Sequence, residues 1–69
     1  MDTTTCTATS QDDPFIIGQT YTISSYQSGD DFTNVGASSN DIGISFIATG
    51  MYAANWENGS MLSYNKAAP

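Results

Sequence analysis

Residues 18–50 read GQTYTISSYQSGDDFTNVGASSNDIGISFIATG and carry the strongest structural signal in this chain. Near their start, residues 20–24 alternate Tyr21 and Ile23 with Thr and Ser. Alternation with a period of two is typical of a strand with one buried face. We therefore expect a strand here, with Tyr21 and Ile23 on its core side.

Residues 42–48 repeat the alternation and give the clearest strand pattern in the chain. Their core face is expected to carry Ile42, Ile44 and Phe46, opposite the apolar side chains of the first strand. Gly50 is expected to end this strand or to form a bulge in it. The segment thus predicts a strand, a polar corner and a second strand.

The polar corner, residues 28–40, consists largely of Ser, Gly, Asp, Asn and Thr, which favour turns. Asp30 or Asp31 is expected to cap one short helical turn near residues 31–35. Phe32 and Val35 are three positions apart, so such a turn points both of them onto the sheet.

The C-terminal part of the chain contains Asn58-Gly59, a strong signal for a two-residue hairpin turn. This signal predicts that residues 52–56 pair antiparallel with residues 60–64. Residues 65–69 are expected to form a frayed tail.

The first 14 residues are rich in Thr, Ser, Gln and Asp, and we expect them to form an extended N-terminal arm. Two interpretations stay open: a frayed terminus, or an arm that adds a strand to the sheet edge of a neighbouring subunit. Thr favours strands, which suits the second interpretation. Cys6 has no base or cation near it in sequence, so its thiol is expected to be unreactive.

These patterns predict an all-β chain, with a small antiparallel sheet or sandwich-like domain over residues 15–64. A domain of this size buries only about 60% of the surface of its unfolded chain, so its core is marginal. One cysteine and no histidine exclude an internal disulfide and a Cys/His metal staple. Stabilisation by partner chains, including a homo-oligomer, is therefore expected.

Charge is strongly unbalanced, with a formal net charge of −6 and Lys66 as the single basic residue. Such a chain cannot neutralise phosphates, which argues against nucleic-acid partners and against binding to anionic membranes. No apolar run approaches the roughly 18 residues that a membrane span needs. The N-terminal residues lack the pattern of a signal peptide, so assembly in a cytoplasm is expected.

Enzymatic activity and cofactors are not expected, because Ser and Thr hydroxyls need a neighbouring base and the chain has no histidine. Asp30, Asp31 and Asp41 admit two interpretations, a calcium loop or a set of turn formers. They lack the ligand spacing of an EF-hand, which favours turn formers and no metal.

Aromatic residues are numerous, and Tyr21, Phe32 and Phe46 are expected in the core. Tyr26, Tyr52 and Trp56 are harder to bury in so small a domain, and Tyr and Trp are enriched at interface hot spots. A protein contact is preferred over a sugar-stacking platform built with Asn55, Glu57 and Asn58. The expected partner-contact residues are Thr3, Thr4, Thr5, Phe15, Tyr26, Tyr52, Trp56 and Tyr64.

Residues 18–50 resemble a small module of virion proteins of tailed bacteriophages, of the marine and cyanobacterial phage type. The pattern is G-x-x-Y-x-I, then D-F-T-x-x-G-A-x-x-N, then G-x-x-F-x-A-T-G, and the order and spacing of its three blocks agree. The matching residues are Gly18, Tyr21, Ile23, Asp31, Phe32, Thr33, Gly36, Ala37, Asn40, Gly43, Phe46, Ala48, Thr49 and Gly50. The family continues with Gly/Thr-rich sequence, whereas this chain has MYAANWENGSMLSYN, which is expected to form a specialised contact surface.

The resemblance implies a viral structural protein located in the virion. The preferred interpretation is a capsid decoration (cement) protein that contacts the major capsid protein or other virion proteins in many copies. A small tail, neck or fibre-associated component is the nearest alternative, and a module that binds host glycans ranks below it.

Overall fold

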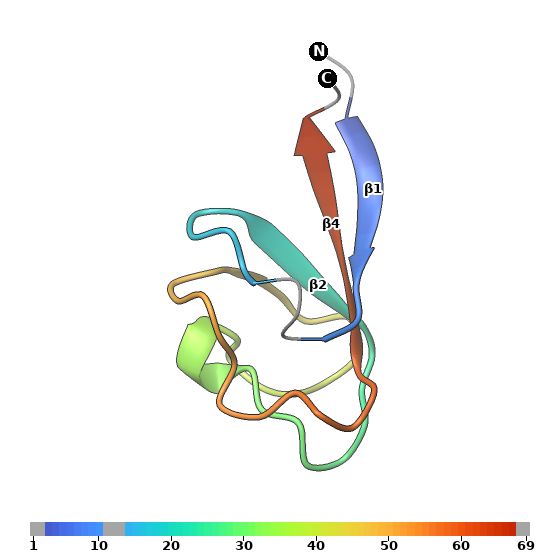
Figure 1. The fold of residues 1–69 in the computed structure, drawn as a ribbon, viewed down its shortest axis with the longest axis vertical. Helices are drawn as coiled ribbons and strands as arrows, with labels where there is room; N and C mark the ends of the chain where they lie inside the picture. The colour runs from blue at the N-terminus through green and yellow to red at the C-terminus, as the bar shows by residue number, and fades with distance from the viewer. Residues whose placement is uncertain (1–2, 11–13, 68–69) are drawn as a thin grey trace.

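The computed structural model describes residues 3–10 and 14–67, and its centre is one antiparallel sheet (Figure 1). The strands lie in the order β1-β4-β2-β3. Their bounds are Thr3–Ala8 for β1, Thr20–Ser25 for β2, Ser45–Ile47 for β3 and Met61–Ala67 for β4, and one 3-10 turn, η1, spans Thr33–Val35. The prediction of a small all-β domain with a helical turn near residues 31–35 is confirmed.

The N-terminal segment differs from the expected arm, because residues 3–8 pair with β4 of the same chain. The pairing runs from Thr3 opposite Ala67 to Ala8 opposite Leu62, so residues 65–67 belong to a strand and do not fray. β1 and β4 run side by side past the end of β2 (Figure 1). Residues 9–10 and 14 of the expected arm lie outside the strands, and residues 1–2, 11–13 and 68–69 of the expected arm and tail are outside the described residues.

β2 is the strand that the alternating pattern predicts, and Tyr21 and Ile23 are both buried. β3 is shorter than predicted, with three residues, of which Phe46 is buried. Ile42 was expected in the core but is 69% exposed. The reason is local: a turn closed by the bond from the Ile44 N–H to the Asp41 carbonyl (3.2 Å) interrupts the alternation before β3 begins.

The predicted hairpin at Asn58-Gly59 is wrong. A type I′ turn needs positive φ at both central residues, and Asn58 does not have it. Residues 52–56 form only an isolated bridge, between Asn55 and Asp31, and β4 pairs with β1 and β2 instead. The turn-forming signal was real, but the loop that contains it folds around a buried carboxylate, described below.

The core lies on one face of the sheet, where the long connections between strands cover it. Phe15 is central to it, with ring centroids 4.8 Å from Tyr21 and 5.3 Å from Trp56. Phe32 and Val35 are 0% exposed, which confirms that the helical turn points them onto the sheet. The buried hydrophobic residues are Ala8, Phe15, Tyr21, Ile23, Phe32, Val35, Ala37, Phe46, Ala48, Ala53, Trp56 and Leu62.

The segment after η1 closes the sheet at β3. The Thr49 N–H donates to the Val35 carbonyl at 2.9 Å. Gly36, at φ +120°, lies so close to β3 that a Cβ added there would be 2.5 Å from the carbonyl oxygen of Ile47. Only glycine fits this approach, so the chain itself covers one edge of the sheet.

Candidate protein-contact surfaces

The buried carboxylate in the described residues is that of Asp30, which is 1% exposed. Its Oδ1 accepts the backbone N–H groups of Glu57 and Asn58, both at 3.0 Å, and its Oδ2 accepts that of Ser60 at 3.1 Å. Burial by itself raises the pKa of Asp30, but the hydrogen bonds from Ser60, Asn58 and Glu57 outweigh it and hold the pKa below its ordinary value. The site is occupied by the protein's own donors.

Ser60 completes this site from the other side. Its hydroxyl oxygen accepts the Gln27 N–H at 2.7 Å, and its carbonyl accepts Nε1–H of Trp56 at 2.8 Å. Both ends of the loop that carries Asn58 and Gly59 are therefore bonded to the segment that follows β2. This is a structural role, and it explains why the loop does not form a hairpin.

Asp31 also acts on its own backbone. Its Oδ1 accepts the N–H of Thr33 at 3.0 Å and the hydroxyl of Thr33 at 2.7 Å, and Nδ2 of Asn40 lies 3.2 Å away. These bonds, that from the Thr33 hydroxyl first, lower the pKa of Asp31. Both neighbouring carboxylates thus fix turns, as the turn-former interpretation expects, and the described residues contain no group of three or more side chains placed to hold a metal.

Two of the expected contact residues, Phe15 and Trp56, are each 3% exposed. Their rings stack with a centroid distance of 5.3 Å, and Phe32 meets Trp56 edge-on at 5.1 Å. This corrects the expectation that Phe15 and Trp56 present their rings to a partner or a sugar. The domain buries them because its connections supply a second aromatic layer over the sheet.

The other expected aromatics are distributed between core and surface. Tyr26 and Tyr64 are partly buried against the core, and the Tyr26 hydroxyl donates to the Asp30 carbonyl. Tyr64 packs on Tyr21 with a centroid distance of 4.9 Å. Tyr52 is 55% exposed and is the expected aromatic that the structure places on the surface.

Several exposed apolar side chains, Tyr52 among them, come from neighbouring segments of the chain, and sequence reasoning did not assign them a role. These segments are side by side, because the Phe15 N–H donates to the Met51 carbonyl and the Gly18 N–H to the Ala48 carbonyl, both at 2.9 Å. We define the apolar cluster as Ile16, Ile17, Ile47, Met51 and Tyr52, all about half or more exposed. The run Phe15-Ile16-Ile17 was its sequence signal, but the chain pattern could not tell which of the three faces inward.

The outer face of the sheet carries a row of uncharged polar residues. Thr7, Ser63, Thr22 and Ser45 occupy one row across β1, β4, β2 and β3. The hydroxyls of Thr22 and Ser45 lie 2.8 Å apart, so this row is partly satisfied internally.

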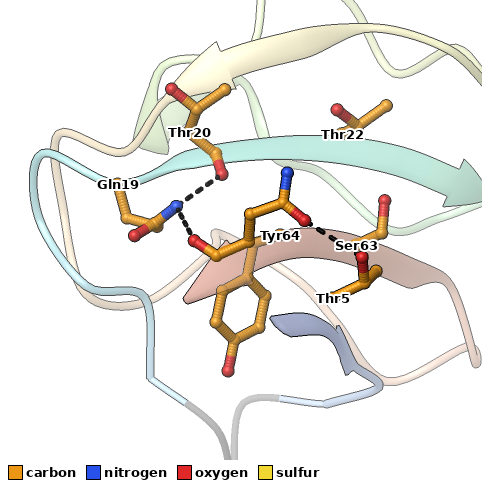
Figure 2. A pocket seen from close by; sticks show the side chains of 7 residues that line it. Thr5, Gln19, Thr20, Thr22, Ser63 and Tyr64 are labelled. Carbon is orange, nitrogen blue, oxygen red and sulfur yellow. Dashed lines mark hydrogen bonds between the residues drawn. The ribbon is translucent and has the colours of Figure 1, made fainter. Parts of the chain in front are cut away.

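A shallow hollow of about 150 Å³ lies on this face between β1, β4 and β2 (Figure 2). The Gln19 amide reaches across it, donating to the Thr20 carbonyl at 3.2 Å and the Asn65 carbonyl at 2.9 Å, while the Thr5 hydroxyl donates to Oδ1 of Asn65 at 3.0 Å. The lining carries no base beside a nucleophile and no charged side chain, so it offers no catalytic constellation.

The expected contact residues of the N-terminal segment lie in β1. Thr4 and Thr5 are exposed, and Thr3 is opposite Ala67 at the end of the strand. Cys6 is a free, half-buried cysteine in the middle of β1. β1 is the end strand of the sheet, so these residues border an edge rather than a frayed arm.

Comparison with protein-family models, with curated proteins and with solved structures finds no match to this chain. Over the described residues there is no helix long and apolar enough to span a membrane.

Proposed function

We propose that this protein is a structural component of a tailed-bacteriophage virion and that it acts as a capsid decoration protein. In this role it binds the major capsid protein, or another virion protein, in many copies after assembly in the host cytoplasm. Binding to the assembled shell and not to its separated parts stabilises the shell by mass action. The motif resemblance of residues 18–50 suggests the virion, and the surface of the domain supports a role in protein contact.

The observation that carries the proposal is the apolar cluster. Ile17 is 62% and Tyr52 55% exposed, although the domain has a core that takes up twelve other hydrophobic residues. Exposed apolar side chains on neighbouring segments of a small domain are typical of contact sites for proteins. An exposed Tyr among such side chains is typical of an interface anchor.

The net charge of the chain determines which partner surfaces it approaches most readily. The chain has a net charge of −6, so its approach is favoured toward a basic protein surface and disfavoured toward nucleic acid or another acidic surface. The apolar cluster itself contains no charged residue, which lowers the desolvation cost of contact. We therefore expect affinity from the cluster and a salt-dependent association rate from the net negative charge of the chain.

A reconstitution experiment tests the proposal. Particles assembled without this chain are mixed with the purified protein, and the amount retained after sedimentation and the temperature of DNA release are measured. The wild-type chain is expected to bind in many copies and to raise the release temperature. The double variant Ile17→Ser/Tyr52→Ser is expected to bind about tenfold or more weakly, because it removes a central apolar contact.

The matched control is Ile42→Ser/Met61→Ser. These residues are also exposed, at 69% and 40%, but they are not part of the apolar cluster. The control is expected to bind like the wild type. Equal loss of binding in both variants would argue against a specific surface, and no binding by the wild type would argue against decoration. Binding confined to the tail or neck would still support a structural protein of the virion but would argue against its location on the capsid.

A further inference from the structure

We infer that this protein pairs with a second copy of itself through the exposed edge of β1, joining two four-stranded sheets into one antiparallel sheet. The proposed contact is the backbone edge of residues 3–8, a different surface from the apolar cluster. It depends on the β1 edge alone, so it stands or falls separately from the virion role.

The two edges of the sheet differ in how they are protected. At β3 the strand has three residues, and the chain around Val35 and Gly36 lies against it. At the opposite end, β1 has six residues, and within residues 3–10 and 14–67 it pairs on one side only, with β4. A long unpaired edge is a template for another strand. Natural edges are blocked by charge, proline or a bulge, and the sequence TTTCTA contains no charge and no proline while its pairing with β4 is regular.

The self-complementary and uncharged edge of β1 points to another copy of this chain as the source of the second strand. Two copies with a net charge of −6 repel each other over most of their surfaces. They can approach where no acidic group lies, and β1 is such a place because its residues are Thr, Cys and Ala. The edge is also self-complementary, because an antiparallel pair of identical strands satisfies a two-fold axis.

Geometry restricts the register. A two-fold axis perpendicular to a continuous antiparallel sheet passes between two copies of one residue, so that the core faces of both copies lie on the same side. Axes at Thr5 or at Cys6 pair most of the strand, matching residues 3–7 or 4–8 with their counterparts. In both cases the Cys6 residues of the two copies are near each other, directly opposite at about 5 Å or diagonal at about 7–8 Å between Cα atoms.

Cys6 therefore serves as a reporter for the interface. The full chain is treated with a short bismaleimide over a range of protein concentrations, with Cys6→Ser as the control for specificity. Sedimentation velocity measures the dimer without cross-linking. An edge of about five residue pairs is small, so we expect a weak dimer, with Kd on the order of 0.1 mM. Cross-linked dimer is expected to rise with concentration.

Charge variants identify the edge as the contact. Thr5→Lys/Thr7→Lys places lysines opposite each other in either register and is expected to weaken the dimer about tenfold. Mixing this variant with Thr5→Glu/Thr7→Glu is expected to restore dimer as a heterodimer. The same charge change on β2, Thr20→Lys/Ser24→Lys, is the matched control and is expected to leave the dimer unchanged. Circular dichroism of each variant checks that the sheet is intact.

The results separate the possible occupants of the edge. A dimer that weakens with like charges, recovers in the mixture and cross-links through Cys6 supports the inference. A chain that remains monomeric up to about 1 mM overturns it. A dimer that ignores the β1 charges, or that forms without Cys6 cross-linking, also overturns it and indicates a contact elsewhere or an exchange of β1 between copies.

Discussion

The Asp30 carboxylate accepts the backbone N–H of Ser60 at 3.1 Å, across 30 residues of sequence, with both side chains at most 1% exposed. Around this bond the polar corner after β2 and the loop before β4 are held against the core. The bond joins the two longest connections between strands, in which η1 is the one short regular element. Much of the stability of the covering layer is therefore expected to depend on one carboxylate.

The first prediction concerns removal of that charge. Asp30→Asn keeps the shape but turns an amide N–H₂ toward one set of backbone donors, leaving buried N–H groups without acceptors. The free energy of unfolding is expected to fall by about 2–4 kcal/mol. Urea unfolding followed by circular dichroism measures it. Asp41→Asn, at an exposed carboxylate bonded by the Ser39 hydroxyl, is the control and is expected to change stability by less than about 0.5 kcal/mol.

The second prediction is the pH dependence of stability. The pKa of Asp30 is below its ordinary value of 3.8 in the folded protein, so the unfolded chain binds more protons as the pH falls through that range. Its contribution is thus fully present above the unfolded pKa and is lost as the pH falls through the lower, folded pKa. Asp31 acts in the same direction.

The urea midpoint is therefore expected to be level near neutral pH and to decline below about pH 5. Asp30→Asn is expected to flatten part of this decline. A decline of equal steepness in the variant would show that Asp30 is not the group responsible.

The third prediction tests the burial of Trp56. Trp56→Phe removes the bond to the Ser60 carbonyl and part of the stacked ring, and is expected to cost about 2 kcal/mol. Tyr52→Ala, at an exposed ring, is expected to cost less than about 0.5 kcal/mol. Because Trp56 is the only tryptophan, acrylamide quenching reports its exposure directly. Strong quenching in the folded protein would contradict its place in the core.

The fourth prediction compares two glycines with positive φ. Gly18→Ala, at φ +92° with no atom within 4 Å of the new Cβ, is expected to cost about 1 kcal/mol from backbone strain. Gly36→Ala adds a 2.5 Å approach to the Ile47 carbonyl and is expected to cost at least about 2–3 kcal/mol. Thermal unfolding of both variants gives the difference. Equal costs would mean that the chain does not close against β3 at Gly36.

Local patterns predicted the part of the fold in which strand and turn signals agree. Tyr21 and Ile23 are buried by the period of their strand, and Phe32 and Val35 by the three-residue spacing of a helical turn. Only a short stretch of sequence separates this strand from the helical turn, so the end of the strand limits where the turn can lie. These elements were accessible to sequence reasoning because the information that specifies them is local.

The remaining errors come from contacts between distant residues. Thr5 and Asn65, which bond to each other, are 60 residues apart, and residues 3–8 carry too few apolar side chains to reveal a strand that pairs within the chain. The hairpin signal at Asn58-Gly59 was overridden because Asp30 binds the backbone around it. The same loop conformation buries Trp56. Of two residues predicted to contact a partner, Trp56 and Tyr52, only Tyr52 is therefore exposed.

The most direct test of the proposed role is the number and position of copies in an intact particle. Quantitative mass spectrometry of purified virions, with cryo-electron microscopy of the same preparation, gives both. The account predicts this chain in many copies, in a fixed ratio to the major capsid protein, with Ile17 and Tyr52 against the shell. Absence from purified particles would contradict a virion role, and a few copies confined to the tail would contradict decoration of the capsid.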